Sequence, residues 1–165
     1  MSELNVKYQL GTKENEAFLA DVREGLFSFG HNFPAPGGSS YYLGDDGTPW
    51  KDRNRETWIT SRMAHVYSLA SFLGHPGSKE LAAAAIKGLR GELHDTANGG
   101  WYAGLTADGN ILPNKQCYAH AFVILAASSG AGNNPKRVSV QIELILNFKC
   151  VQRFHFSSHF CARFL

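Results

Sequence analysis

A segment with helical periodicity, residues 55–73, carries the side chains best suited to chemistry. Trp58, Arg62 and His65 fall at spacings of four and three residues, which places them on one face of a helix. A guanidinium offers five donors in a fixed fork, so an Arg62 that faces a polar pocket is suited to binding ligand hydroxyls. The same pattern also fits a structural arrangement, in which Arg62 pairs with a carboxylate and His65 is hydrogen-bonded in the core.

The helix over residues 55–73 is predicted to be buried on two sides. Leu69 and Phe72 extend the face of Arg62. The opposite stripe is also largely apolar and consists of Ile59, Met63, Val66, Ala70 and Leu73. Because a helix that is apolar on both sides is enclosed by its neighbours, we expect Arg62 and His65 to lie inside the protein or along a cavity.

A second set of candidates lies around residue 118. Tyr118, Phe122 and Leu125 share a helical face, and Gln116 and His120 lie with Tyr118 near the start of that helix. A tyrosine and a histidine at a helix N-terminus are placed to line the mouth of a pocket. An aromatic stripe at this spacing is more often core packing, so both interpretations stay open.

Two acidic pairs suggest a different chemistry. Asp52 and Glu56 lie four residues apart, and Asp45 adjoins Asp46. A glycosidase works with two carboxylates, so such a pair is conceivable here. The simpler interpretation is a solvated loop.

Metal and cofactor signatures are weak or missing. One set of residues imitates a zinc site, although its spacing matches no common zinc finger: Cys150, His155, His159 and Cys161. The Walker, GxGxxG, HExxH and GxSxG motifs do not occur. We therefore predict neither a metal nor a cofactor.

Helices and Gly-rich loops must position these side chains. The periodicity predicts helices over residues 14–29, 55–73, 78–94 and 115–129, with glycines between them. Residues 32–51 and 95–113 form long loops, and such loops tend to carry function. Their aromatic rings suit either the stacking of sugar rings or the anchoring of the loops; they are Tyr41, Tyr42, Trp50, Trp101 and Tyr102.

The two long loops contain a repeat. Residues 37–47 align without gaps on residues 99–109, at a constant offset of 62 residues, and each copy reads as Gly-Gly, aromatic residues and then Asp-Gly. Asp-Gly between short strands is typical of a hairpin turn. A helix comes after each copy, so the sequence predicts stacked helical hairpins that bury their apolar faces against one another.

Composition excludes several classes of function. The 165 residues are 44% hydrophobic and 18% charged, with a net charge of +2, which is typical of a globular protein and argues against nucleic acid as a partner. No apolar run approaches the roughly 20 residues of a membrane helix. The first 13 residues lack the apolar stretch of a signal peptide, and three widely spaced cysteines do not form a disulfide framework. We expect a cytoplasmic protein without a membrane partner; the oligomeric state is open.

Charge divides the chain near residues 130–135. Residues 1–130 carry 11 basic and 13 acidic residues, whereas residues 131–165 carry five basic residues and one acidic residue. The second part has no glycine after Gly132. We therefore predict two parts, residues 1–130 and an atypical tail of residues 131–165.

Three motifs in the first part resemble the N-acylglucosamine 2-epimerase family, and within it the aldose–ketose isomerase branch. They are Trp58–Ser68 (WITSRMAHVYS), Gly99–Tyr102 (GGWY) and Lys115–Phe122 (KQCYAHAF), and they occur in the order found in the family. The likeness covers about residues 14–130. It implies an all-α (α/α)6 barrel with short β-hairpin loops, of which this chain holds roughly the first helix pairs.

The resemblance also implies a sugar site and a reaction. It assigns Arg62 and Tyr118 to catalysis and substrate binding, with Trp58, His65 and His120 as pocket or supporting residues. The reaction moves a proton between C1 and C2 of an open-chain monosaccharide through an enediolate. Arg62 is suited to stabilise the developing charge, and a histidine is the usual base near neutral pH.

The tail departs from this family. The principal acid/base histidines of the family lie on later inner helices, in a region that this chain does not possess, and residues 131–165 do not resemble the corresponding segment of the family. A shifted reading frame or a truncation explains such a chain. We therefore expect an inactive N-terminal fragment with poor solubility; a fragment of an (α/α)6 glycan hydrolase or lyase and a non-catalytic sugar-binding remnant are the alternatives.

Overall fold

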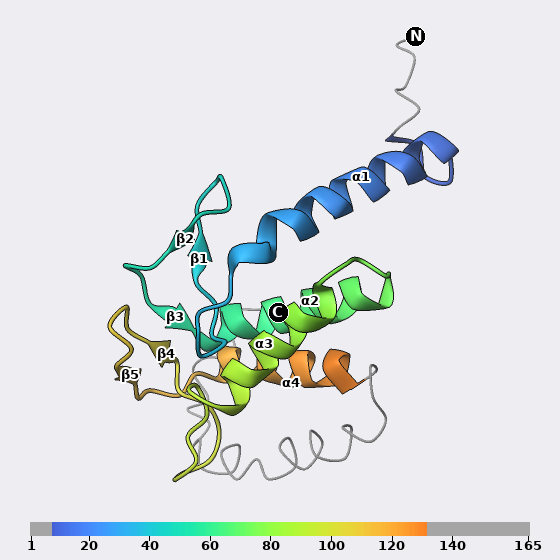
Figure 1. The fold of residues 1–165 in the computed structure, drawn as a ribbon. Coiled ribbons are helices and arrows are strands. Elements are labelled where there is room, and N and C mark those ends of the chain that lie inside the picture. The colour runs from blue at the N-terminus through green and yellow to red at the C-terminus, as the bar shows by residue number, and fades with distance from the viewer. Residues whose placement is uncertain (1–7, 132–165) are drawn as a thin grey trace, which may run out of the picture.

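The computed structural model describes residues 8–131, which form four α-helices and two small β-sheets (Figure 1). The helices are α1 (Lys13–Phe29), α2 (Thr57–Phe72), α3 (Ser78–Arg90) and α4 (Cys117–Ala131), and a 3-10 turn, η2 (Gly30–Asn32), comes directly after α1. The strands are β1 (Tyr42–Leu43), β2 (Pro49–Trp50), β3 (Arg55–Glu56), β4 (Gly104–Leu105) and β5 (Ile111–Leu112). All four predicted helices are confirmed.

The helix ends depend on local chemistry. The Thr12 side chain caps α1 by accepting from the backbone N–H of Asn15 at 3.2 Å. Helix α2 ends in a Schellman motif. In it, Gly74 has a φ of +79° and donates to Ser71 O, and His75 donates to Ala70 O.

The predicted end of the third helix at His94 is wrong. Helix α3 ends at Arg90 because Gly91 leaves the helical conformation, with φ −103° and ψ −104°. His94 instead pairs with Trp101 as an isolated bridge. The predicted boundary near residues 130–135 is covered only at its edge, since α4 includes Gly130 and Ala131 and the tail of residues 131–165 lies, apart from Ala131, outside the described residues.

The repeat predicted from sequence is present in the hydrogen bonds. In the first hairpin the N–H of Gly44 bonds to Thr48 O and that of Gly47 bonds to Gly44 O; the second hairpin makes the same two bonds 62 residues later, from Thr106 to Asn110 and from Gly109 to Thr106. The strand registers agree too, since Tyr42 pairs with Trp50 and Gly104 with Leu112. The second hairpin gains a third strand, β3, which pairs with β4.

Helix α2 is packed through small residues, which corrects the expected burial of its two apolar stripes. Its buried residues are Thr57, Thr60, Ser61, Ala64, Tyr67, Ser68 and Ala70, and α2 packs against both α3 and α4. The hydroxyls of Thr60, Ser61 and Ser68 each donate to the carbonyl four residues earlier, so burial leaves them satisfied. The large side chains Leu69 and Phe72 remain 44% and 51% exposed.

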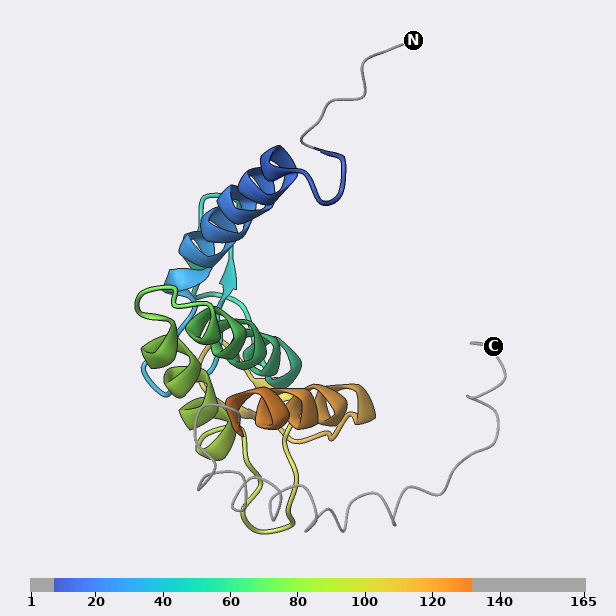
Figure 2. The ribbon, with the colours of Figure 1, turned by 90° about the vertical axis from the view of Figure 1, so that its right-hand side faces the viewer.

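The helices form an arc (Figure 2). Helix α1 lies at one end and α4 at the other, with α3 on the convex side beside α2. The core lies where these helices meet the loops; its side chains are Phe27, Phe33, Ala64, Tyr67, Ala70, Ala82, Ala85, Leu89, Leu93, Trp101, Leu105, Val123 and Ala126. Within residues 8–131, no helix combines the length and apolar character needed to cross a membrane.

Candidate functional site

The N-terminal ends of α2 and α4 bring Trp58, Arg62 and Tyr118 together. The rings of Trp58 and Tyr118 meet edge to face at 5.7 Å between centroids, and Phe122 lies 4.9 Å from Tyr118 and 6.4 Å from Trp58. The guanidinium carbon of Arg62 is 5.5 Å from both the Trp58 and the Phe122 ring. Three of the predicted site residues therefore form one cluster, which also includes Phe122.

Arg62 is exposed, so the expectation that it lies inside the protein is wrong, whereas a position along a cavity stays a prediction. The physical reason is that the buried residues of α2 are mostly small, and Arg62 is not among them. No carboxylate of the described residues forms an ion pair with Arg62, which excludes the structural pairing within this part of the chain. Its donors are held between aromatic faces and are available to a ligand.

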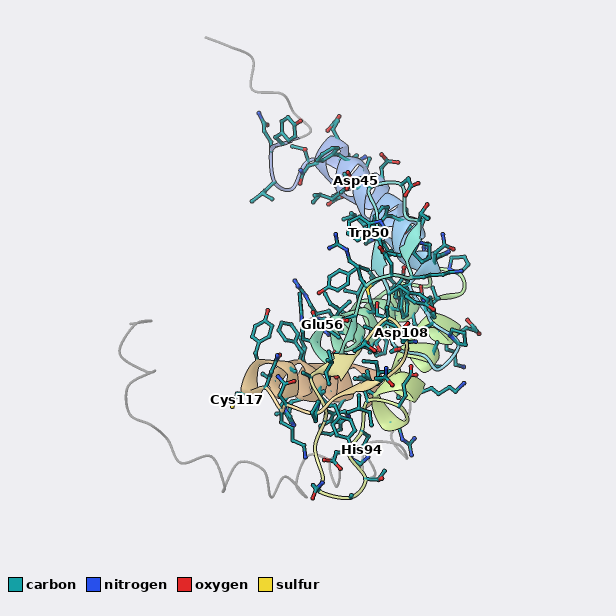
Figure 3. The ribbon with its side chains drawn as sticks, turned by 90° about the vertical axis from the view of Figure 1, so that its left-hand side faces the viewer. Asp45, Trp50, Glu56, His94, Asp108 and Cys117 are labelled. Atoms are coloured by element: carbon teal, nitrogen blue, oxygen red, sulfur yellow. The ribbon has the colours of Figure 1, made fainter. Side chains whose placement is uncertain are left out.

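Glu56 is a functional candidate that sequence reasoning considered only as a partner of Asp52. One carboxylate oxygen, Oε2, accepts hydrogen bonds from Trp58 Nε1 at 2.6 Å and from the Tyr42 hydroxyl. Burial and this bond raise the pKa of Tyr42 to about 12, so Tyr42 stays protonated and donates. Figure 3 shows Glu56 between the hairpins and α2. Glu56 thus fixes the orientation of the Trp58 ring. The sequence feature that could have identified this role is a carboxylate two residues before the tryptophan.

His65 links the two helices farther along the same side. Its Nδ1 lies 2.5 Å from Ser129 Oγ, and that hydroxyl lies 2.9 Å from Leu125 O. Because the hydroxyl donates to Leu125, the Nδ1–H of His65 is the donor toward Ser129. Nε2 makes no hydrogen bond to any described residue, and the half-buried ring therefore keeps one nitrogen for another partner.

His120 lies in the core and supports the loop of residues 94–101. It is 5% exposed. Its Nε2 accepts from the backbone N–H of Trp101 at 3.1 Å, and its Nδ1 donates to Gln116 O at 2.7 Å. Burial lowers the pKa of His120, so the neutral ring that these two bonds require is favoured. Both ring nitrogens are engaged with backbone, which fits a supporting role.

The loop aromatics divide between anchors and open faces. Trp101 is 4% exposed and donates from Nε1 to Leu89 O at 2.6 Å, so it anchors its loop. Trp50 is 38% exposed, with the Arg53 guanidinium 4.2 Å from its ring centroid.

The residues of the two acidic pairs differ in their surroundings. Asp46 is exposed and accepts from the N–H and the hydroxyl of Thr48, as in a solvated turn. Asp52 is exposed, whereas Glu56 is held by aromatic donors.

Metal chemistry receives no new support at this site. Within the part of the chain that the structure describes, no group of three or more His, Cys, Asp or Glu side chains could hold a metal ion. The zinc-like set, Cys150, His155, His159 and Cys161, lies outside the described residues.

Comparison with solved structures supports the fold. A crystal structure of a D-mannose isomerase superposes with a TM-score of 0.68 at 22% identity, covering 85% of this chain and 37% of that one. The cellobiose 2-epimerase from Spirochaeta thermophila DSM 6192 superposes with a TM-score of 0.64 at 20% identity, covering 81% and 37%. These neighbours are (α/α)6 barrels, so the four helices and two hairpins are part of such a barrel.

Comparison of sequences identifies the family. D-mannose isomerase from Thermobifida fusca is 39% identical over 89 residues, which are 53% of this chain and 22% of that protein. The chain thus matches only about a fifth of that relative's length. A sequence model of the N-acylglucosamine 2-epimerase (GlcNAc 2-epimerase) family matches residues 37–155, past the predicted boundary near residues 130–135, which stays a prediction. Since this match covers most of the chain, the protein belongs to the N-acylglucosamine 2-epimerase family.

Proposed function

We propose that this chain forms part of the substrate site of a sugar isomerase or 2-epimerase, and that Arg62 and Tyr118 contact a monosaccharide. One observation carries the proposal. Arg62 is exposed, lacks a carboxylate partner among the described residues and is held by the Trp58 and Phe122 rings beside Tyr118. An arginine with a structural role would be paired with a carboxylate, whereas an arginine that binds a ligand keeps its guanidinium donors available to that ligand.

The proposed reaction is a proton transfer between adjacent carbons. A base removes the proton from C2 of the open-chain aldose, the electron pair forms a C1–C2 double bond, and the carbonyl oxygen becomes an enediolate oxygen. Transfer of the O2 proton to O1, with return of a proton to C1, gives the ketose, and return of the proton to the opposite face of C2 gives the epimer. Either product needs the same stabilised enediolate.

The cluster is suited to stabilise that charge. The Arg62 guanidinium offers charged donors, and the cluster lies near the N-terminal ends of α2 and α4, where the helix dipoles favour an anion. The exposed Tyr118 hydroxyl supplies a neutral donor, and Trp58, fixed by Glu56, supplies an apolar face. In this scheme His65 supports the pocket wall and His120 supports the loop behind it.

We expect the base to come from outside the described residues. By resemblance to the family, the principal acid/base histidines come from later inner helices, in a region that this chain does not contain. We therefore expect no interconversion of mannose and fructose by the isolated 165-residue chain, as monitored by NMR of the sugars. Turnover at an ordinary enzymatic rate would contradict the fragment hypothesis.

A segment exchange tests the site itself. Residues 37–131 would replace the corresponding segment of the Thermobifida fusca D-mannose isomerase, with the parent enzyme as reference. We expect the chimera to interconvert mannose and fructose, and Arg62→Gln to lower its kcat by about 10²–10³-fold because one charged donor to the enediolate is lost. Arg53→Gln is the matched control, because Arg53 also stacks on a tryptophan but outside the cluster.

Two results would count against this function. If Arg62→Gln retained the turnover of Arg53→Gln, Arg62 would not stabilise the reacting sugar. If the folded chimera bound sugar, seen as a change in tryptophan fluorescence, but converted none, the non-catalytic sugar-binding alternative would be favoured. Asp52 is exposed and Glu56 is hydrogen-bonded to Trp58 and Tyr42, so we favour the isomerase over the hydrolase alternative.

A further inference from the structure

Two histidines from different elements meet near the C-terminal end of α2, whereas Trp58 and Arg62 of the sugar cluster lie near its N-terminal end. His31 lies in η2, just after α1, and His75 lies in the turn between α2 and α3. Their Nε2 atoms are 3.1 Å apart. Neither residue belongs to the site described above.

His75 is held in place from three directions. Its backbone N–H closes the Schellman motif by bonding to Ala70 O. Its ring packs 5.2 Å from Phe27, and its Nδ1 lies 2.6 Å from Glu24 Oε2. Its side chain is only 7% exposed. This residue therefore presents a fixed imidazole to His31.

The contact with Glu24 determines which ring nitrogen of His75 carries a proton. A carboxylate accepts, so Nδ1 of His75 carries the proton and its Nε2 presents a lone pair toward His31. A ligating imidazole has this arrangement, in which the second nitrogen donates to a carboxylate that orients the ring. Glu24 thus occupies the place of a supporting carboxylate behind a metal ligand.

The surroundings favour positive charge. His31 and His75 lie just beyond the C-terminal ends of α1 and α2, where unpaired carbonyls attract cations. Neither helix has a basic residue in its last turn. Among the described charged and titratable groups, Glu24 contacts His75, Arg23 forms an ion pair with Glu24, and the ring of Tyr67 lies 6.0 Å from His31.

We infer that His31 and His75 form a two-histidine site for a divalent transition metal of the zinc class. Imidazole nitrogens bind zinc at about 2.0–2.1 Å, so a 3.1 Å separation corresponds to an N–Zn–N angle of about 98°, and widening it by about 0.2–0.3 Å reaches the tetrahedral angle. Water completes the coordination. Without metal, the Nε2–H of His31 donates a hydrogen bond to Nε2 of His75.

Metal binding would join α1 to the α2–α3 turn. Existing links between these elements include the Tyr67 hydroxyl, which donates to Phe27 O at 2.7 Å, and the contacts of Glu24 and Phe27 with His75. A ligand that binds only the folded chain raises its stability by mass action. The inference is independent of the sugar chemistry, because it concerns residues near the other end of α2.

Zinc chloride provides the test on the full chain. We expect saturating zinc to raise the unfolding temperature by about 3 °C and calorimetry to detect the corresponding site. His31→Gln should lose that temperature shift and one equivalent of zinc. Because His31 is exposed, this variant keeps the fold. Glu24→Gln should weaken zinc binding about tenfold, because the supporting carboxylate is lost.

The control is a variant that removes two other histidines of the chain that could bind zinc. His155→Gln with His159→Gln should leave the temperature shift intact. If the unaltered chain and His31→Gln bind the same number of zinc ions and shift equally, the pair only shares a proton and the inference is overturned.

Discussion

The two hairpins of this chain share their hydrogen bonds but not their surroundings. Strands β1 and β2 form a sheet by themselves, whereas β4 and β5 are joined by β3, which comes from the segment that leads into α2. The first copy thus contributes a strand to the second. Nothing in the described residues supplies a matching strand to the first.

The helices that precede the two hairpins also differ in how far their apolar side chains are buried. Helix α3 buries Ala82, Ala85 and Leu89 against its neighbours. Helix α1 leaves a row of large side chains exposed, namely Leu19, Val22, Leu26 and Phe29. The helices that precede the two similar hairpins are therefore unequally buried, as expected where each unit is completed by its neighbour.

The two copies interlock through backbone. Gly88 of α3 lies so close to the first loop that an added Cβ would be 2.5 Å from Gly38 C and Ser39 N. The N–H of Ser39 also donates to Glu92 Oε1 at 2.9 Å. The first loop is thus shaped to the second copy's helix, and the comparison can be tested by disturbing one copy at a time.

The largest effect is expected from Gly88→Val. The new side chain meets backbone that cannot move aside, so the loop and α3 must separate, and we expect a loss of about 3 kcal/mol in the free energy of unfolding. Urea unfolding monitored by circular dichroism measures it. Ala83→Val, on the exposed side of the same helix, should cost about 0.5 kcal/mol. Equal losses from the two variants would contradict the interlock.

The next largest effect concerns the pH dependence of stability, and it compares a buried carboxylate near the second hairpin, Asp95, with an exposed one in the first hairpin, Asp46. Asp95 is 2% exposed and lies 2.8 Å from Lys115 Nζ. The hydrogen bond from Lys115, and then that from the Asn98 backbone, hold the pKa of Asp95 well below its usual range. This lowered pKa stabilises the fold above the unfolded value of about 4 and ceases to do so as the pH falls further.

Asp95→Asn should therefore reduce stability at pH 7 and flatten its fall between about pH 5 and pH 2. Unfolding temperatures across that range measure both effects. Hydrogen bonds from Thr48 also lower the pKa of Asp46, but this group is exposed, so Asp46→Asn should change the pH profile much less. A profile of Asp95→Asn parallel to that of the unaltered chain would exclude the role of Asp95.

Local features of this fold could be predicted from the sequence. The four helices are indicated by periodicity and glycine punctuation, and the repeat is indicated by the constant spacing of Gly-Gly and Asp-Gly. Each of these signals acts within a few residues of its own position. The periodicity extends the third helix too far because the conformation of Gly91 depends on the loop that it enters.

Contacts between distant segments could not be predicted in this way. Thr60, Ser61 and Ser68 look like a polar face, yet they are buried because their hydroxyls bond to their own helix. Glu56 gains its role from Tyr42, across a hairpin. Arg62 has no ion-pair partner among the described residues, and this depends on the side chains of every neighbouring element. Periodicity alone could therefore not distinguish a ligand-binding Arg62 from a structurally paired one.

The smallest effect compares the two hairpin turns directly. Gly47 and Gly109 have φ values of +78° and +87°, a region that costs other residues about 1 kcal/mol. Gly47 also lies against the end of α1, where an added Cβ would be 3.2 Å from Phe29 O, whereas Gly109 meets only the tip of Arg55 at 3.6 Å. Gly47→Ala should thus destabilise more than Gly109→Ala, although the turns are equivalent.

Urea unfolding of both variants tests the difference, with Gly25→Ala as the reference of opposite sign. Gly25 lies inside α1 with open space around it, so alanine there should stabilise the helix by up to about 1 kcal/mol. Equal losses at Gly47 and Gly109 would mean that α1 does not press on the first hairpin. A larger loss at Gly47 would show that the first copy, though open on one side, is held by its own helix.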